Sequence, residues 1–416
     1  MPSLQSFFGL IVLTLSCWLI SENRQKVRFG DALIGLTLQI LLAVILLKLP
    51  FSLKLFELLN KIVTSLQEAT NAGSSFVFGY LGGGALPFIE KQPGSSFILA
   101  FQALPLILVI SALSSLLFYW KILPAIVGIF SGILQKTLRI GGALGVGAAA
   151  NIFIGMIEAP LLIRPYLQTM TRSELFTLMT CGMATIAGTV MVLYATILQD
   201  IIPGGAMGHI LVASIISAPA AITVSRIIIP NSGNLTAGKP SQPIQVSSSM
   251  DAITTGTASG VHLLIHVLAM LVVLVALVHL LNQILGFLPD ISGSPLSLQR
   301  MLGTFMAPVT WLIGIPWNEA RTAGSLMGIK TILNEFLAYL ELANLSPGTL
   351  QPRSILIMTY AMCGFANFGS LGIMIGGMVS MAPERRQDIV SLSMKSLLAG
   401  TIATCMTGAV VGILTP

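Results

Sequence analysis

The sequence has few charged residues for its length. Only 9% of its 416 residues are Asp, Glu, Lys or Arg, whereas a soluble globular domain carries roughly 25%. So few charges cannot cover the surface of a soluble protein of this size, and no polar stretch is long enough to form a separate soluble domain. The 4 cysteines each stand alone in an apolar stretch, without the spacing of a metal site.

Enzyme and metal motifs are also missing. The chain has no Walker lysine motif, no Gly-x-Ser-x-Gly elbow and no paired aspartates within its apolar runs. His262 and His266 stand one helical turn apart, but HLLIH lacks the Glu of a zinc hydrolase and no third ligand is evident. We therefore expect neither catalytic residues nor a cofactor. Lys and Arg lie between apolar runs rather than in a basic stripe, so we expect no nucleic-acid partner.

What the sequence does have is long hydrophobic runs. A membrane-spanning helix needs about 20 predominantly apolar residues. Eight runs predict full spans, at residues 5–20, 31–50, 98–120, 174–198, 207–229, 258–284, 353–380 and 388–414. The first run lacks a basic leader and a small-residue cleavage site, so it is expected to be a retained span. The predicted fold class is an all-α polytopic membrane protein.

Two further apolar stretches contain residues that a lipid-facing helix excludes. Residues 141–165 and 314–343 include Gly, Pro, Asn and Glu, as in GVGAAANIFIGMIEAP and GIPWNEARTAGSLMGIKTILNEF. Irregular backbone at membrane depth is tolerated only where it is buried in protein or lines a wet cavity. Both stretches are therefore predicted to be re-entrant helical hairpins. For the same reason, the fourth and seventh spans are predicted to unwind near residues 184–189 and 363–370.

The order of these elements occurs twice along the chain. Residues 98–229 and 258–416 each have three crossings, an odd number, so the two units face opposite ways. This is the inverted-repeat plan of secondary transporters, in which the substrate site lies at the midplane. Residues 1–97 are expected to add scaffold spans and residues 230–257 a cytoplasmic linker. The Lys and Arg distribution favours a multi-pass protein of the plasma (inner) membrane with its N-terminus outside.

Carboxylates at membrane depth are costly and are therefore functional candidates. Of 15 acidic residues, only Glu158, Glu319 and Glu335 lie in the predicted hairpins. Glu158 and Glu335 occupy corresponding places, which suits a polar ligand with several hydroxyls or ring nitrogens. Alternatively, each acid pairs internally, for example Glu335 with Lys330. Glu319, beside Pro316, is expected to be a structural cap.

Neutral polar side chains accompany these acids. Asn151 and Thr185 could supply oxygens to a small hard cation, with backbone carbonyls completing its shell. Asn367 and Ser370 could hydrogen-bond a polar substrate, and Phe365 could lie against a flat one. The alternative is that these amides and hydroxyls only bridge helices.

Several of these segments resemble a known family. NIFIGMIEAPLLIRPYL is similar to the first hairpin of the concentrative nucleoside transporters, PWNEA and KTILNEFLAYL to the second, and FANFGSLGI to the seventh span. The resemblance follows chain order over nearly the whole sequence. It implies a homotrimer in the lipid bilayer, with scaffold and transport domains, in which the mobile transport domain carries a nucleoside across the scaffold.

The resemblance also implies site residues. The implied substrate contacts are the first-hairpin acid, the ribose-binding acid, two sugar contacts, an aromatic and a wall residue: Glu158, Glu335, Asn367, Ser370, Phe365 and Val190. The implied sodium ligands are the side chains of Asn151 and Thr185 and the carbonyls of Ile154 and Ile186.

One part of the family pattern is absent. Family members usually have Gln followed by Thr or Ser before the hairpin acid, where they hydrogen-bond the nucleobase. Here those positions are Met156 and Ile157, whose side chains make no directional hydrogen bond. Recognition of ribose is therefore expected, while the base preference is left open.

These observations predict a sodium-coupled symporter that moves nucleosides into the cell by alternating access. Proton coupling, with Glu158 or Glu335 as carrier, is the alternative within transport. The oxygens of Asn151 and Thr185 favour sodium, because a proton needs no oxygen cage. The alternative from another class is an integral-membrane enzyme acting on a nucleotide-linked or lipid substrate.

Overall fold

The computed structural model describes residues 2–90, 96–202, 205–231, 233–238, 246–290 and 295–415. Within these ranges the regular secondary structure is helical, without strands, which confirms the all-α class. The α-helices are α1 (Pro2–Leu19), α2 (Phe29–Lys48), α3 (Pro50–Phe78), α4 (Leu99–Gln102), α5 (Leu106–Tyr119), α6 (Ile122–Leu138), α7 (Gly142–Asn151), α8 (Glu158–Leu161), α9 (Arg172–Ala184), α10 (Gly188–Leu198), α11 (Ala206–Ile228), α12 (Ser249–Leu285), α13 (Leu298–Leu312), α14 (Trp317–Ile332), α15 (Glu335–Ala343), α16 (Pro352–Met362), α17 (Phe368–Met381) and α18 (Arg386–Leu414).

The helices long and apolar enough to span a membrane correspond to predicted spans. Six such segments occur in the described residues, with mean hydropathy from 1.8 to 2.9: Phe29–Lys48, Leu99–Tyr119, Arg172–Leu198, Ala206–Ile228, Ser249–Leu285 and Pro383–Leu414. The other two predicted spans correspond to α1, a shorter apolar helix, and to α16 followed by the short apolar helix α17. α12 begins earlier than predicted, because the Ser248 side chain accepts from Asp251 N and caps its polar first turn.

The fourth and seventh spans are interrupted where the sequence predicts it. The first break, residues 185–187, separates α9 from α10, and the second, residues 363–367, separates α16 from α17. A backbone N–H of the second break pairs with a carbonyl of the first, since Phe365 N donates to Thr185 O at 3.1 Å. The two breaks therefore lie against each other, and this bond satisfies one backbone N–H and one carbonyl that have left the helices.

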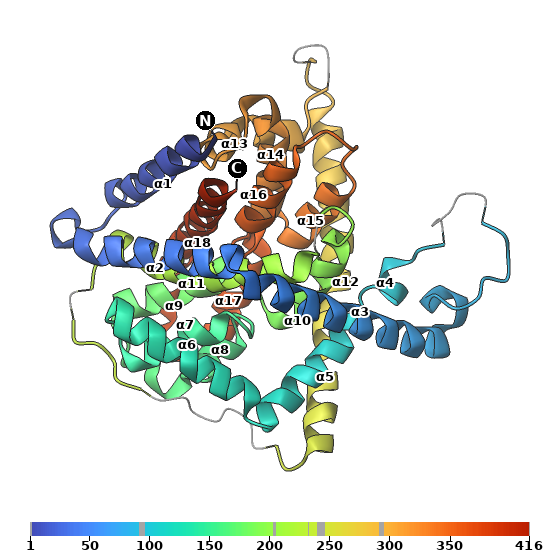
Figure 1. Cartoon of the computed structure of the whole chain (residues 1–416), viewed down its shortest axis with the longest axis horizontal. Helices are drawn as coiled ribbons and strands as arrows, with labels where there is room; N and C mark the ends of the chain where they lie inside the picture. Colours follow the sequence, from blue (N-terminus) through green and yellow to red (C-terminus); the bar gives the residue numbers. More distant parts are fainter. Residues whose placement is uncertain are drawn as a thin grey trace.

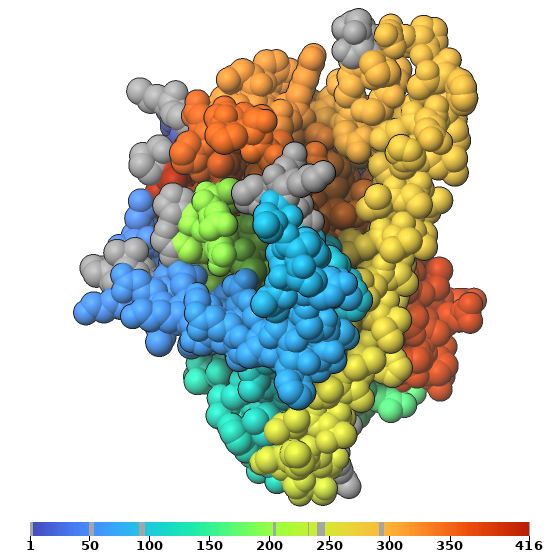
Figure 2. Space-filling model, turned by 90° about the vertical axis from the view of Figure 1, so that its right-hand side faces the viewer, coloured from blue at the N-terminus to red at the C-terminus, as the bar shows by residue number. Residues whose placement is uncertain are grey.

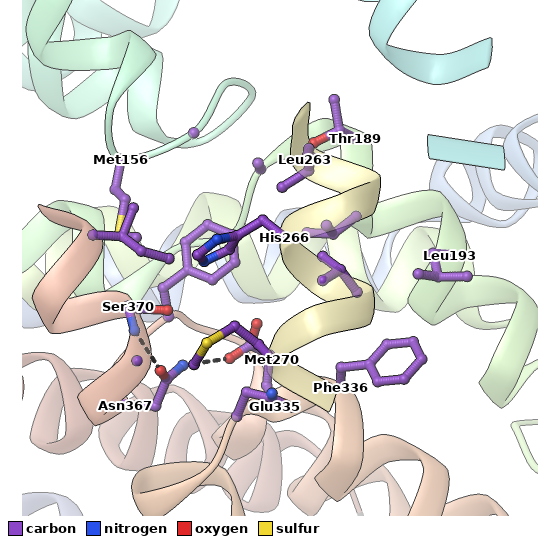
Figure 3. A pocket seen from close by; sticks show the side chains of 18 of the residues that line it. Met156, Thr189, Leu193, Leu263, His266, Met270, Glu335, Phe336, Asn367 and Ser370 are labelled. Carbon is purple, nitrogen blue, oxygen red and sulfur yellow. Dashed lines mark hydrogen bonds between the residues drawn. The ribbon is translucent and has the colours of Figure 1, made fainter. Parts of the chain in front are cut away.

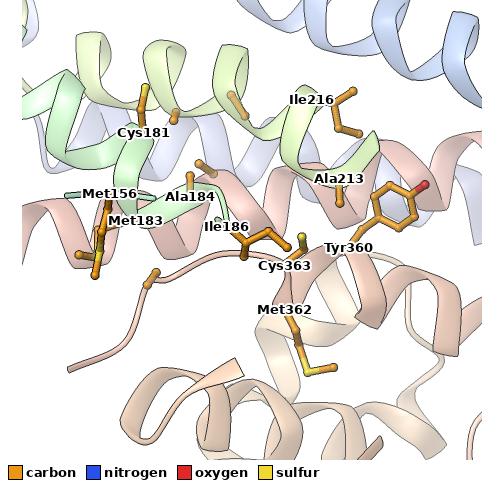
Figure 4. Close-up of a cluster of buried hydrophobic side chains, with 14 of the residues drawn as sticks. Met156, Cys181, Met183, Ala184, Ile186, Ala213, Ile216, Tyr360, Met362 and Cys363 are labelled. Atoms are coloured by element: carbon orange, nitrogen blue, oxygen red, sulfur yellow. The ribbon is translucent and has the colours of Figure 1, made fainter. Parts of the chain in front are cut away.

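Fully buried side chains surround these breaks. Figure 4 shows Cys181 and Ile186 near the first break, Ala213 on α11, and Tyr360 and Cys363 near the second, and all five are inaccessible to solvent. α11 contacts α2, α9 and α18, so it lies at the centre of the helical packing. The irregular backbone is thus enclosed by protein, which is the condition for its stability at membrane depth.

The two segments predicted as hairpins lie on opposite sides of the molecule. Figure 1 shows α7 and α8 below α10 and α11, whereas α14 and α15 lie above them. The division of the chain into a scaffold, two repeats and a linker remains a prediction. Part of the predicted linker, residues 232 and 239–245, lies outside the described residues.

α12 runs through nearly the full height of the molecule (Figure 1), on the face that Figure 2 shows, and packs mainly on α5. A Cβ added at Gly256 would lie 2.6 Å from Ser111 O, and one added at Gly260 would lie 3.1 Å from Leu108 Cα. The glycines therefore permit a close helix–helix approach that larger residues would prevent. Much of the remaining surface of α12 is exposed and apolar.

Candidate functional site

A pocket lies where the two breaks and the hairpin turns face α12 (Figure 3). It brings together every side chain that the sequence analysis assigned to substrate: Met156, Ile157, Glu158, Val190, Glu335, Phe365, Asn367 and Ser370. These residues come from four separate segments of the chain. Their convergence provides one polar wall and one apolar wall for a small ligand.

Helix starts surround the polar wall. Glu158 and Glu335 are the first residues of α8 and α15, and α10 and α17 also begin here. The Asn334 side chain accepts from Leu337 N at 2.9 Å, and the Asn367 side chain accepts from Ser370 N at 2.7 Å. These caps hold α15 and α17 in place. Because helix starts carry partial positive charge, they favour carboxylates and oxygen-rich ligands nearby.

Glu335 is the most strongly constrained acid of the pocket. Its side chain is 3% exposed, and its two oxygens accept separate hydrogen bonds. Tyr194 Oη donates to Oε1 at 2.7 Å, and Asn367 Nδ2 donates to Oε2 at 2.8 Å. Such charge-assisted bonds fix the carboxylate plane. Remaining lone pairs can accept from ligand hydroxyls that enter the pocket.

The alternative pairing of Glu335 with Lys330 is not present as an ion pair among the described residues. Lys330 is fully buried, and its Nζ has no hydrogen-bond partner in the described part of the chain.

Glu319 fits the predicted capping role, since its Oε2 accepts from Gln351 N at 3.2 Å.

The turn before Glu158 is shaped by glycine and apolar packing. A Cβ added at Gly155 would lie 2.3 Å from the Glu158 Oε2, so glycine lets the carboxylate fold back over the turn. Met156 is buried, and Ile157 packs its Cδ1 against Gly377 of α17. The two positions that depart from the family pattern are therefore apolar parts of the pocket.

The predicted cation ligands lie beside the first break. Asn151 is 1% exposed; its Nδ2 donates to Gly147 O at 3.0 Å, and among the described residues its Oδ1 has no partner. Thr185 Oγ1 donates to Cys181 O at 2.8 Å, which leaves its lone pairs available. The remaining predicted ligands, the carbonyls of Ile154 and Ile186, belong to the non-helical segments next to these side chains. Neutral oxygens of this kind suit a small hard cation.

Sequence reasoning missed four polar residues of the pocket: Tyr194, Thr189, Asn334 and His266. His266 was considered only as a zinc ligand, and within the described chain no three His, Cys, Asp or Glu residues gather at one point. Its helical spacing from Leu263 and Met270, which also line the pocket, would have indicated a shared face. Nothing in the local sequence distinguishes Tyr194 from an ordinary core tyrosine.

The arrangement defines a class of protein. A pocket enclosed by discontinuous helices, with helix starts facing the ligand and a continuous helix opposite, is the architecture of a secondary transporter.

Comparisons with known proteins specify that class. Residues 8–81 match the N-terminal part, and residues 209–412 the C-terminal part, of Na+ dependent nucleoside transporters. Residues 100–200 match a nucleoside-recognition region. The nucleoside permease NupC of Helicobacter pylori is 34% identical over 99% of this chain and 97% of that protein.

Solved structures agree with these matches. CNTnw in an inward-facing substrate-bound state superposes with a TM-score of 0.91 at 32% identity, covering 99% of both chains. A CNTnw variant in an outward-facing state gives 0.92 at 32% identity, covering 100% of this chain and 98% of that one. The chain therefore belongs to the concentrative nucleoside transporter family. It is a nucleoside transporter and not an enzyme.

Proposed function

We propose that the protein is a sodium-coupled symporter that carries nucleosides into the cell by alternating access. The observation that carries this proposal is the buried Asn151 Oδ1, which has no partner in the described part of the chain and lies in the same hairpin segment as Glu158 of the pocket. A cation held by Asn151 and a nucleoside held near Glu158 would order the same turn. The inward-facing and outward-facing states of CNTnw support alternating access as the mode of transport.

In this proposal the ribose binds at the start of α15 and α17. Glu335 accepts from ribose hydroxyls, while Tyr194 and Asn367 hold its carboxylate in orientation. Ser370 and Asn367 supply further polar contacts, and Phe365 lies beside the sugar. Val190 forms part of the apolar wall.

Sodium is bound by neutral oxygens between the hairpin and the first break. The side chains of Asn151 and Thr185 and the carbonyls of Ile154 and Ile186 form the proposed ligand set. Because Thr185 donates its proton to Cys181 O, its hydroxyl oxygen presents lone pairs rather than hydrogen to a cation.

The base is held mainly by apolar contact and by Glu158, which accepts hydrogen bonds but cannot donate them when ionised. Met156 and Ile157 contribute surface without directional bonds. Apolar pockets discriminate weakly between ligands. We therefore expect broad base tolerance, or a preference for purines, which bury more ring surface than uridine.

We further propose a homotrimer in the plasma (inner) membrane with the N-terminus outside. The exposed apolar surface of α12 supports lipid or subunit contact along this helix. Light scattering of the purified protein should give the mass of three 44.0 kDa chains. A monomer mass in several mild detergents would contradict the trimer.

The coupling ion is tested by uptake into proteoliposomes. Labelled uridine and adenosine should accumulate under an inward sodium gradient and not when choline replaces sodium. Thr185→Val removes one proposed ligand and should raise the sodium concentration for half-maximal uptake, and Asn151→Leu should do so at least as much. Thr180→Val is the matched control, because Thr180 is equally buried on α9 and makes the same kind of hydrogen bond, to Phe176 O.

A different result would identify the alternative. Equal uptake in choline, abolished only by a protonophore, would exclude sodium coupling and indicate protons. An equal sodium requirement in the Thr185→Val and Thr180→Val variants would exclude Thr185 from the ion site.

A further inference from the structure

α12 contributes one polar side chain to an otherwise apolar wall. Six of its residues line the pocket: Leu263, His266, Val267, Met270, Leu271 and Leu274. Of these six side chains, only that of His266 has an N–H group that can donate a hydrogen bond. Figure 3 shows it reaching from α12 into the pocket, between Met156 and Ser370.

His266 lies across the pocket from the first-hairpin turn, whose side chains offer no hydrogen-bond donor. Met156 and Ile157 make no directional bond, and Glu158 in the same turn is an acceptor. The ribose half of the pocket, by contrast, has paired groups in Glu335 and Asn367. A nucleobase in the remaining space would therefore lie between the Glu158 carboxylate on α8 and the His266 imidazole on α12.

The chemistry of these two groups is complementary. A neutral imidazole has one N–H donor and one acceptor nitrogen. Uracil, hypoxanthine and guanine each present an N–H next to a carbonyl, whereas cytosine and adenine present an amino group where those bases have the carbonyl. A carboxylate that accepts from the ring N–H and an imidazole that donates to the neighbouring carbonyl would together recognise the keto bases.

We propose that His266 is a base-reading residue that donates a hydrogen bond to the carbonyl of keto nucleobases, while Glu158 accepts from the adjacent ring N–H. This inference rests on the proposed transport of nucleosides. To the broad tolerance expected from the apolar turn and Glu158 alone, it adds a selectivity within each ring size, inosine over adenosine and uridine over cytidine. It also assigns the base contact to a helix that packs mainly on α5, apart from the helix starts that bind ribose.

The test measures competition against uptake of labelled inosine and labelled uridine in proteoliposomes. His266→Phe keeps a flat ring but removes the donor. It should weaken inhibition by inosine, guanosine and uridine roughly threefold to tenfold and leave adenosine and cytidine nearly unchanged. His266→Gln retains an N–H donor and should therefore keep part of the preference for keto over amino nucleosides. The sodium concentration for half-maximal uptake should not change, since the proposed ion ligands lie beside the first break.

His262→Phe is the matched control, because it places the same substitution one turn earlier on α12, outside the pocket lining. If His266→Phe does not fold, His266→Leu and His266→Gln give the same comparison of a side chain without a donor and one with a donor. The inference would be overturned if His266→Phe left the ratio of inhibition by keto and amino nucleosides unchanged, or weakened inhibition by all five nucleosides equally. A wild-type protein that accumulates no nucleoside would instead overturn the proposed function.

Discussion

Glu335 is a buried acid whose carboxylate the protein holds in one orientation. Each of its oxygens accepts from one protein donor, Tyr194 Oη or Asn367 Nδ2, so the carboxylate is satisfied and oriented before a ligand arrives. An amide in its place has one oxygen and one NH₂ group. A glutamine side chain could therefore accept a hydrogen bond from only one of these two donors. Its own NH₂ group would point toward the other donor.

We predict that Glu335→Gln leaves a folded protein with much weaker nucleoside binding. Losing hydrogen bonds to a charged acceptor costs about 1.5 to 3 kcal/mol, which corresponds to roughly tenfold to a hundredfold in affinity. Uptake of uridine and adenosine over a concentration series measures this. Glu341→Gln, an exposed acid on the same helix, serves as the control. Unchanged affinity in Glu335→Gln would exclude the ribose role.

A second prediction concerns Met156 and Ile157. The double change Met156→Gln with Ile157→Thr supplies the missing hydrogen bonds and should improve uridine relative to purines. Thr is smaller than Ile, so the contact with Gly377 leaves room for it. Competition by uridine, adenosine and guanosine measures the ranking, and the sodium dependence should stay the same. A wild type that already strictly prefers uridine would contradict our account of the apolar base site.

Charged groups connect several helices around Glu22, which itself lies outside the membrane-spanning segments. Glu22, between α1 and α2, pairs with Arg172 at the start of α9 at 3.1 Å and with Lys395 on α18. Its backbone N donates to Ile228 O at 2.8 Å, which adds α11 to the junction. Partial burial alone would raise the pKa of Glu22, but hydrogen bonds from Lys395 and Arg172 hold it below its ordinary value.

This junction predicts a pH-dependent contribution to stability. Because the folded-state pKa of Glu22 is lowered, its stabilisation is present above the unfolded-state pKa and is lost as pH falls through the folded value. Glu22→Gln should therefore lower the thermal stability at neutral pH, by about 1 kcal/mol or less for a partly exposed network. The difference from wild type should vanish in acid. Thermal unfolding across pH measures it, with the exposed Glu57→Gln as control; a constant difference would contradict the mechanism.

For the whole molecule, the proposed ion and nucleoside sites share one structural unit. Asn151 ends α7, and Glu158 begins α8 after one short turn. Gly188 N, at the start of α10, donates to Phe153 O at 2.9 Å, so the turn is also bonded to the first break. Ordering this unit with one ligand should reduce the cost of binding the other.

The resulting prediction is reciprocal linkage. Sodium should tighten nucleoside binding by some factor, and nucleoside should tighten sodium binding by the same factor. Equilibrium binding of uridine at several sodium concentrations, and of sodium with and without uridine, gives both factors. Choline at equal ionic strength is the control. Two factors equal to one would show that the sites are independent.

Much of the fold could be predicted from local sequence. Apolar runs of the required length indicated the spans, and Gly, Pro and polar residues within them indicated the breaks after Ala184 and Met362. The substrate residues assigned from motifs line one pocket. Their roles, together with the sodium ligands and the repeat boundaries, remain predictions.

Local sequence is enough to show that the chain is a helical membrane protein and where its helices unwind, because hydrophobicity and backbone preference act over a few neighbouring residues. Which distant side chains meet is evident only in the folded molecule. Tyr194 donates to Glu335 across a separation of 141 residues, and His266 on α12 lines one pocket together with residues of α8, α10, α15 and α17. Such contacts depend on the rotation and packing of whole helices, which local composition does not specify.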